Sequence, residues 1–314
     1  MKQLIIATRK SQLALWQSEH IKAKLNVAYP DMEVILKEMS TKGDKILDTP
    51  LAKIGGKGLF TKELEDAMLE KTAHIAVHSL KDVPMEFPPG LVLGAVTKRE
   101  DARDALLSEK YEDIDSLPEG AIVGTTSLRR RMQLLALRPD LQIKNLRGNV
   151  NTRIRKLKNG EYDAIILATA GMNRLGLGSE VKYMTPIAVT QMIPAMGQAA
   201  LGIEAIDNPE ILEIISILQD EKAYIETTVE RDFVTILEGG CQVPIGVHAQ
   251  FDGEQITARC CVGMPDGTQI IKEKRYCDKS SFKQMGKELA DTMIENGAIK
   301  LLKQAEEMAL KEIF

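Results

Sequence analysis

Short apolar runs alternate with amphipathic segments through the first two thirds of the chain. The apolar runs predict strands at 4–7, 33–36, 74–77, 91–96, 122–124, 141–146 and 163–168, and the amphipathic segments predict helices at 11–28, 59–69, 127–137 and 150–157. This alternation is typical of α/β domains, so we expect mainly parallel sheets covered by helices. The highly charged stretch 97–104 predicts a crossing between two such domains, and a return crossing is expected near 191–198.

The pattern changes after about residue 220. A helix is predicted at 223–237, followed by strands at 243–250, 255–262 and 268–276 that are joined through turns at Asp252-Gly253 and Pro265-Asp266-Gly267. A last helix begins near Ser281, with a break at Asn296-Gly297. These elements predict a small α+β domain with an antiparallel sheet.

Composition adds the expected environment of the protein. The chain is 44% hydrophobic and 27% charged, as in ordinary globular proteins. The apolar run at the N-terminus is too short for a signal peptide, and no later segment is apolar enough to span a bilayer. We therefore expect a cytoplasmic protein without a membrane partner.

Positive charge is concentrated in one segment. Residues 121–160 hold ten Lys or Arg against the single Asp140, a net charge of +9 in a chain of net charge −4, so the rest carries −13. A solvated helix face is the plain alternative, since most charge runs are only that. A cationic segment in an acidic chain nevertheless favours a defined anionic ligand over a nucleic acid.

Arginines stand where helices are expected to begin. Ser127 can cap the helix that carries Arg129 and Arg130, and Asn149 or Asn151 can cap the helix that carries Arg153 and Arg155. Arg9, just before the possible cap Ser11, repeats the pattern. Guanidinium groups beside free backbone N–H groups are suited to binding carboxylates.

Two further stretches are candidates for a site. The glycine-rich stretch 53–58 lacks the ending of a nucleotide-binding P-loop, so a flexible loop that brings Lys53 and Lys57 over an anion site is the better hypothesis. The strand at 74–77 delivers Ser79, Lys81 and Asp82 to its carboxyl end, where open α/β sheets build their sites. Asp82 can be catalytic or can merely cap a turn before Pro84.

Metal binding is not expected. His74 and His78 are interpreted as packed strand residues, because no third ligand lies at metal spacing.

All four cysteines lie in the last quarter of the chain, without the paired spacing of a zinc site. Cys241 follows two glycines on a predicted turn, which can present a thiol without crowding. Cys260 and Cys261 fall within a strand pattern and are interpreted as packing residues.

Six motifs together resemble porphobilinogen deaminases, in the same order and at similar spacing across nearly the whole chain. They are Ala7-Thr8-Arg9 with Ser11, 53–60 (KIGGKGLF), 78–84 (HSLKDVP), 124–130 (GTTSLRR), 146–149 (LRGN) and 238–244 (EGGCQVP). Six motifs in register are far more specific than any one of them.

The resemblance implies a fold class and domain boundaries. Two periplasmic-binding-protein-like α/β domains are expected, the first at 1–98 and 198–217 and the second at 99–197. A C-terminal α+β domain with a small antiparallel sheet is expected at 218–314, carrying the cofactor cysteine. The family also implies a monomer.

The resemblance further implies a dipyrromethane primer joined by a thioether to Cys241. Four porphobilinogens are added to it with loss of ammonia, and hydroxymethylbilane is released. Residues implied to hold the cofactor are Ser79, Lys81, Thr125, Ser127, Arg129 and Arg130; those implied for substrate are Arg9, Ser11, Lys53, Lys57, Arg147, Gly148, Arg153, Arg174 and Gln198. Asp82 is implied as the catalytic carboxylate, with no metal.

Two alternatives remain from the residues themselves. A two-lobed anion-binding protein without chemistry fits the α/β pattern, and a nucleic-acid binder could use the basic segment. Aromatic residues for base stacking are few, at 4%. One departure from the family pattern is Ala199, where a glycine is common, and we expect it to stiffen the hinge between the lobes slightly.

Overall fold

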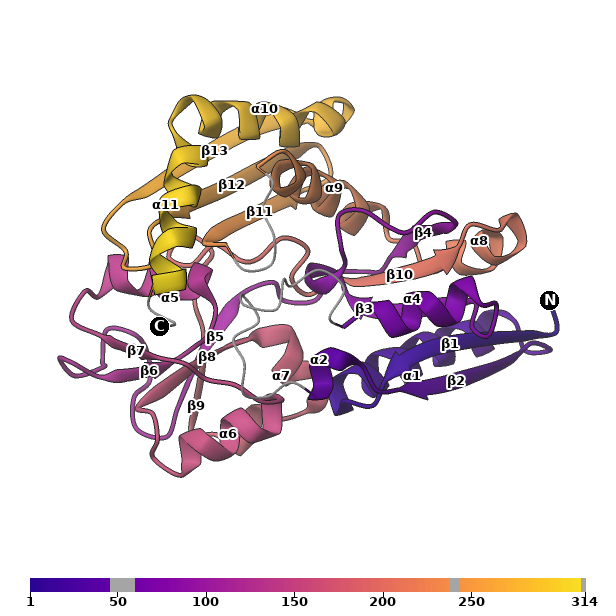
Figure 1. Cartoon of the computed structure of the whole chain (residues 1–314), viewed down its shortest axis with the longest axis horizontal. Coiled ribbons are helices and arrows are strands. Elements are labelled where there is room, and N and C mark those ends of the chain that lie inside the picture. Colours follow the sequence, from indigo (N-terminus) through magenta and orange to yellow (C-terminus); the bar gives the residue numbers. More distant parts are fainter. Residues whose placement is uncertain (46–59, 238–242, 312–314) are drawn as a thin grey trace. The chain divides into compact units, whose positions relative to one another are not determined.

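The computed structural model describes residues 1–45, 60–237 and 243–311, and it contains three separate sheets (Figure 1). The described residues fall into two compact units. Unit 1 holds those within 1–45, 60–100 and 199–224, and unit 2 holds 101–198 and those within 225–311.

Unit 1 is built around a mixed five-stranded sheet in the order β2-β1-β3-β10-β4. Its strands are β1 (Gln3–Arg9), β2 (Glu33–Met39), β3 (Ile75–Ser79), β4 (Leu91–Val96) and β10 (Leu201–Ile206). β1 pairs in parallel with β2 and β3, whereas β10 is antiparallel to β3 and β4.

Helices cover both faces of this sheet because alternate strand residues are apolar on each side. α1 (Gln12–Ala28) and α8 (Pro209–Ser216) pack on the face that holds Leu4 and Ile6. α4 (Lys62–Leu69) packs on the opposite face against Ala7 and Ala76. The short helix α2 (Lys42–Lys45) follows β2, and the 3₁₀ turn η1 (Leu80–Asp82) follows β3.

Unit 2 begins with a second mixed sheet in the order β7-β6-β8-β5-β9. Its strands are β5 (Asp104–Ser108), β6 (Ile122–Gly124), β7 (Gln142–Lys144), β8 (Ala164–Ala168) and β9 (Tyr183–Pro186). Helix α5 (Leu128–Leu137) packs on one face, and α6 (Val150–Lys158) and α7 (Thr169–Leu175) pack on the other. The 3₁₀ turn η2 (Gly178–Glu180) precedes β9.

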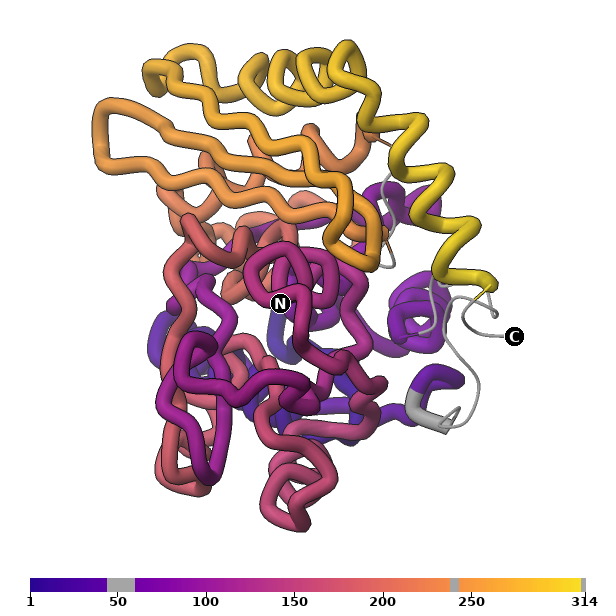
Figure 2. The backbone as a smooth tube through the Cα atoms, turned by 90° about the vertical axis from the view of Figure 1, so that its left-hand side faces the viewer, coloured from indigo at the N-terminus to yellow at the C-terminus, as the bar shows by residue number. Residues whose placement is uncertain are grey.

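The remainder of unit 2 is an antiparallel sheet in the order β11-β12-β13 with helices against it (Figure 2). Its strands are β11 (Ile245–Phe251), β12 (Gln255–Gly263) and β13 (Ile270–Asp278). Its helical elements are α9 (Glu221–Ile236), whose first four residues are counted with unit 1, η3 (Lys279–Ser281), α10 (Phe282–Glu295) and α11 (Ala298–Lys311). Two buried carboxylates of α9 accept from the edge strand: Glu230 from the N–H of Ala249 and Glu226 from that of Phe251, both near 2.8–2.9 Å. Two N–H groups at the free edge of β11 are thereby paired without a fourth strand.

The predicted fold class, two α/β parts and a C-terminal α+β part, is confirmed by these sheets. The prediction of mainly parallel sheets is wrong, because each five-stranded sheet has two parallel and two antiparallel pairs. The antiparallel pairs come from β10 and β5, two strands that the apolar pattern missed. Each is the first strand after a crossing segment and enters its sheet against the direction of its neighbours.

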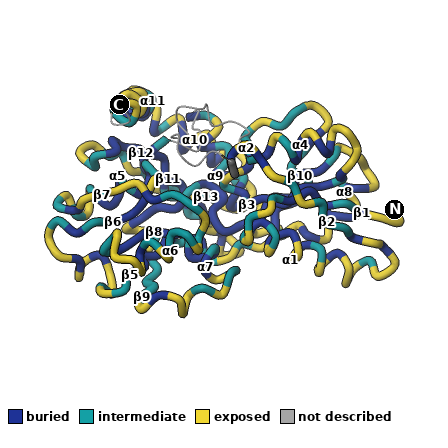
Figure 3. Tube along the Cα trace, turned by 60° about the horizontal axis from the view of Figure 1, so that its bottom comes forward, coloured by how far each residue is buried: buried dark blue, intermediate teal, exposed yellow. Residues whose placement is uncertain are grey.

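Burial follows the sheets, as Figure 3 shows by the dark tubes of the central strands. The break predicted within the last helix, at Asn296-Gly297, is confirmed: Gly297, between α10 and α11, has φ 91°. No helix among the described residues is long and apolar enough to cross a membrane.

Ala199 lies in an unusual backbone conformation at the boundary between the units. Its φ is 77°, a left-handed region that costs an L-residue about 1 kcal/mol more than glycine. Its carbonyl accepts a hydrogen bond from the N–H of Glu100 at 3.1 Å, and the residue is buried, so the conformation is held in place. The expected stiffening of the hinge stays a prediction.

Candidate functional site

The start of α5 is built by two hydroxyl side chains. Ser127 is the N-cap and accepts a hydrogen bond from the backbone N–H of Arg130, as the sequence predicted. Thr125 Oγ1 accepts in turn from the N–H of Ser127 at 3.2 Å. The cap fixes the direction in which the first turn of α5 presents Arg129 and Arg130.

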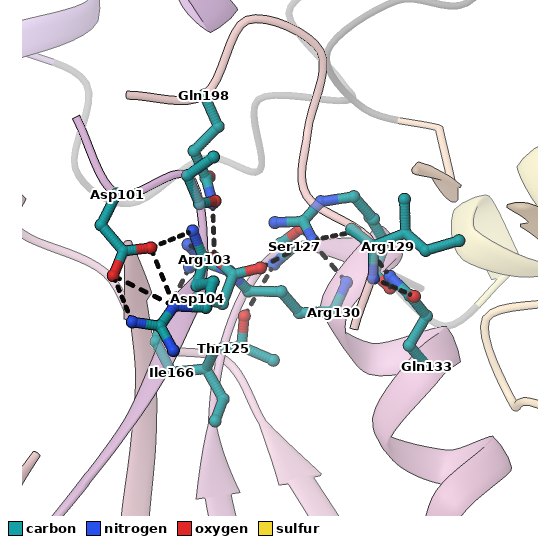
Figure 4. A network of polar contacts seen from close by, with 12 residues as sticks. Asp101, Arg103, Asp104, Thr125, Ser127, Arg129, Arg130, Gln133, Ile166 and Gln198 are labelled. Atoms are coloured by element: carbon teal, nitrogen blue, oxygen red, sulfur yellow. Dashed lines mark hydrogen bonds and ion pairs between the residues drawn. The ribbon is translucent and has the colours of Figure 1, made fainter. Parts of the chain in front are cut away.

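Both arginines bind one buried carboxylate, Asp104, the first residue of β5 (Figure 4). Arg129 Nη1 donates to Asp104 Oδ2 and to the carbonyl of Ile193, each at 2.7 Å. Arg130 donates to Asp104 Oδ1 through Nε at 3.1 Å and Nη2 at 2.7 Å, and through Nη1 to the carbonyl of Ile166. Asp104 is fully buried and the arginines nearly so.

Two buried glutamines complete the frame around Asp104. Gln198 Nε2 donates to the carbonyl of Ala102 at 2.8 Å and to Asp104 Oδ1 at 3.0 Å. Gln133, one turn along α5, accepts from the N–H of Ile193 and donates to its carbonyl. The segment from Ile193 to Gln198 is thus hydrogen-bonded at Ile193 to α5, the helix that carries the arginines.

The charges of this cluster do not cancel. Burial alone raises the pKa of Asp104, but the charges of Arg129 and Arg130 outweigh it and hold that pKa well below its usual value. Burial lowers the pKa of Arg130, and a guanidinium nevertheless keeps its charge in proteins. The neighbouring Asp101 and Arg103 form their own ion pair. Among the described residues, the two guanidiniums of Arg129 and Arg130 therefore share one carboxylate, which leaves one buried positive charge in excess.

A second cationic group lies at the start of α6. Asn149 is its N-cap and accepts from the N–H of Thr152, which settles the choice left open between Asn149 and Asn151. Gly148 has φ 110°, and a Cβ there would come within 2.7 Å of Thr152, so this position requires glycine. Arg153 Nε donates to the carbonyl of Gly148 at 2.8 Å, which directs its guanidinium along the helix start.

Unit 2 carries two more of the predicted cations, Arg147 and Arg174. Arg147 is half-buried just before Gly148, and Arg174 is half-buried in the last turn of α7.

Unit 1 places its predicted residues at the carboxyl ends of β1 and β3. Ser11 caps α1, accepting from the N–H of Ala14, and the guanidinium carbon of Arg9 stacks 4.3 Å from the ring centroid of Phe60. Ser79 Oγ accepts a hydrogen bond at 2.8 Å from Gln17 Nε2 of α1. In η1, directly beyond Ser79, Lys81 is half-buried and Asp82 is exposed.

Three predicted site residues, Lys53, Lys57 and Cys241, lie outside the described residues. The interpretation of Cys260 and Cys261 as packing residues is confirmed, because both are fully buried in β12. Burial raises the pKa of Cys261 to about 11, and it raises the pKa of Cys260 further still. Neither thiol is an effective nucleophile near neutral pH.

Sequence reasoning missed Asp104 and Gln133 as parts of the site. Asp104 was assigned to the crossing segment, although it opens a buried strand. The sequence did hold one signal: residues 121–160 carry ten cations and one acid, and a buried cation needs a carboxylate partner from another segment. In the described part of the chain no three His, Cys, Asp or Glu side chains are grouped as a metal ion requires.

Two family descriptions cover most of the chain. "Porphobilinogen deaminase, dipyromethane cofactor binding domain" matches residues 4–213, and "Porphobilinogen deaminase, C-terminal domain" matches residues 224–295. The chain belongs to the porphobilinogen deaminase family. Porphobilinogen deaminases similar to it over almost their whole length include those of Campylobacter curvus, 63% identical over 98% of this chain and 99% of the relative, and Aliarcobacter butzleri, 60% identical over 99% and 100%.

Similar solved structures are more distant. A TRAP periplasmic solute-binding protein from Desulfovibrio salexigens has 12% identity and TM-score 0.42 over 70% of this chain and 73% of its own. A putative periplasmic sulfonate-binding protein from Methylobacillus flagellatus has 14% identity and TM-score 0.40 over 76% and 73%. Scores this low establish no shared fold, so the fold assignment stands on the sheets themselves.

The donors of this cluster suit a dipyrromethane cofactor, whose pyrroles carry carboxylates. A guanidinium has five N–H donors. Contacts to described residues use two of those of Arg129 and three of those of Arg130, so donors remain on both. The uncompensated positive charge and the hydroxyl of Ser127 beside it match an anionic group.

Proposed function

We propose that this chain condenses four porphobilinogen molecules head to tail on a dipyrromethane primer held through Cys241, releasing ammonia and then hydroxymethylbilane. The observation that carries the proposal is the buried cluster of Arg129, Arg130 and Asp104, with one positive charge in excess. A buried charge without a counter-charge is costly, so the cluster favours binding of an anion. A chain of pyrroles that each bear an acetate and a propionate is such a ligand.

The remaining predicted residues are assigned by the part they can play. Hydroxyls and cations that we propose for the cofactor are Ser79, Lys81, Thr125, Ser127, Arg129 and Arg130. Those that we propose for the incoming substrate are Arg9, Ser11, Lys53, Lys57, Arg147, Gly148, Arg153, Arg174 and Gln198. Arg9 and Arg153 are supported by their half-buried, oriented guanidiniums. Gln198, which is buried against Asp104, would serve substrate binding indirectly, by holding the carboxylate that anchors Arg129 and Arg130.

Asp82 is the proposed acid–base residue. Porphobilinogen that has lost ammonia is a cationic electrophile, which a carboxylate beside it can stabilise. The same carboxylate can accept the proton that the attacking pyrrole carbon gives up once the new carbon–carbon bond has formed. Support for Asp82 comes from its place in η1, exposed at the carboxyl end of β3 and next to Lys81.

The primer, when bound, supplies a pyrrole carbon that attacks the substrate. This chain must hold it through a nucleophilic thiol. Burial raises the pKa of Cys260, Cys261 and Cys277, which makes each of them a poor nucleophile. Cys241, on its glycine-rich segment, is therefore the cysteine that we propose for attachment.

The test of this function is the stoichiometry of a reaction with porphobilinogen. We expect four ammonia molecules to be released for each hydroxymethylbilane formed, measured by an enzymatic ammonia assay beside the absorbance of the oxidised product. An anion-binding protein without chemistry would bind porphobilinogen and release no ammonia, which would contradict the proposal.

We further propose the domain boundaries 1–98 with 198–217, 99–197 and 218–314, and a cytoplasmic monomer. The boundaries are supported by the three separate sheets, whose strands fall one sheet to each segment. Family membership supports the monomer and the compartment.

A further inference from the structure

A buried histidine–glutamate pair lies at the end of β3, beside the turn that carries Asp82. His78 Nε2 lies 2.9 Å from Oε2 of Glu204 on β10, and the two side chains are 6% and 0% exposed. In the antiparallel register His78 is opposite Gly202, so Glu204 reaches it diagonally on the same face. The pair therefore ties the two strands together at this point.

The buried carboxyl group of Glu204 depends on His78 for its hydrogen bond. His78 makes the only hydrogen bond to that carboxylate from the described residues, since Glu204 Oε1 has no partner among them. Glu65 of α4 is buried nearby, and burial, reinforced by the charge of Glu204, raises the pKa of Glu65. Without the imidazole, Glu204 would be a buried carboxyl group with no hydrogen-bond donor among the described residues.

β10 and the residue before it also contact the η1 turn and its flanking residues. The N–H of Leu80 donates to the carbonyl of Ala200 at 2.9 Å. A Cβ at Gly202 would lie 2.9 Å from Leu80 and 3.2 Å from Val83, so these two buried side chains rest directly on the strand. Leu80 and Val83 flank Lys81 and Asp82 in the sequence, and a shift of β10 would move the turn with it.

We infer that His78 and Glu204 are positioning residues for Asp82. Their hydrogen bond locks β10 against β3, and β10 in turn fixes the direction in which η1 presents its carboxylate. A displacement of about 1 Å at a reacting group can lower a rate about 100-fold. A hydrogen bond that fixes the position of the η1 turn therefore affects the rate even though it does not touch the substrate. The inference rests on the proposed role of Asp82.

The first test replaces the pair by apolar side chains of similar size, His78→Phe with Glu204→Leu. Each single change should lower the unfolding midpoint by several degrees. Glu204→Leu leaves the buried imidazole of His78 without its hydrogen-bond partner, and His78→Phe leaves the buried carboxyl group of Glu204 without its partner. The double variant should recover the wild-type midpoint. Its kcat for porphobilinogen should stay at least about tenfold below wild type, with KM changed less than about twofold, because the substrate cations are untouched. Wild-type kcat in the double variant would overturn the inference.

The second test keeps the hydrogen bond and removes only the charge. Glu204→Gln offers His78 an amide oxygen in the same place, so kcat should remain within about threefold of wild type. A loss of tenfold or more in this variant would overturn the inference even if the apolar pair failed to fold, because the hydrogen bond would then not be what matters.

The matched control is His74→Phe. His74 directly precedes the first residue of β3, at the end of the strand away from η1. His74 Nδ1 accepts a hydrogen bond from the N–H of Ile5, so its loss should lower the unfolding midpoint and leave kcat unchanged. Asp82→Asn in the same assay separates the two claims. If Asp82→Asn turns over normally, the proposed role of Asp82 fails and the inference with it. If Asp82→Asn is inactive while the apolar pair has wild-type kcat, the positioning inference alone fails.

Discussion

Asp82→Asn is expected to lower kcat for porphobilinogen by about 10²- to 10⁴-fold, the range that a general acid–base group contributes. An amide is close to a carboxylate in shape, but it can neither accept a proton nor stabilise a cation by its charge. Because Asp82 is exposed in η1, its replacement should leave the unfolding midpoint unchanged. The measurement is steady-state turnover together with intact mass, which should show the cofactor still attached.

The matched control for this variant is Glu86→Gln, a second exposed acid four residues further on. It should retain kcat within about twofold, because nothing assigns it to the reaction. Near-normal turnover by Asp82→Asn with its cofactor attached would remove Asp82 from the chemistry.

Asp104→Asn is expected to be among the most destabilising single changes in unit 2. The substitution removes the counter-charge from two guanidiniums that are 6% and 8% exposed, and breaking a buried ion pair in this way typically costs about 3–5 kcal/mol of unfolding free energy. Urea denaturation at neutral pH measures the loss. Turnover should fall as well, since Arg129 and Arg130 lose their common anchor.

A surface pair of the same chemistry provides the control. Asp140 binds Arg138 through both carboxylate oxygens, at 2.8 and 2.7 Å, but the side chains are 27% and 21% exposed. Asp140→Asn should therefore cost only about 0–1 kcal/mol. A loss at Asp104 no larger than that at Asp140 would contradict the account of the buried cluster.

The pH dependence of the Asp104 effect has a definite sign. The pKa of Asp104 is depressed in the folded state, so its stabilising contribution is fully present above the usual value of 3.8. The contribution is lost only as the pH falls below that value toward the folded-state pKa. The difference in stability between wild type and Asp104→Asn should thus stay constant from pH 7 to about pH 5 and shrink in stronger acid.

Features that depend on neighbours in the sequence could be predicted, and those that depend on distant partners could not. Ser11, Ser127 and Asn149 were placed correctly as helix caps, because a cap and the N–H it binds are only two or three residues apart. β5 and β10 were missed because each apolar run is short and holds an acid, Asp104 or Glu204. Both acids are tolerated only through a partner on another element.

The roles of the predicted site residues stay predictions, and the sequence did not show how these residues contact one another. Arg129 and Arg130 were identified from motif and helix position, but their pairing with Asp104 joins residues 25 and 26 positions apart on different elements. The same holds for His78, which was interpreted as a packed strand residue and is indeed buried, although its partner lies 126 residues away. Periodicity shows that a side chain is buried, whereas its partner is set by the sheet topology.

The most direct test of the central claim is the intact mass of the freshly purified protein under denaturing conditions, because a thioether-linked primer survives unfolding. The wild type should exceed its polypeptide mass by two condensed pyrrole units. Cys241→Ala should lose this excess, whereas Cys277→Ala, which changes a half-buried thiol in β13, should keep it. Bare polypeptide mass in the wild type, even after incubation with porphobilinogen, would contradict a covalent primer and leave an anion-binding protein in its place.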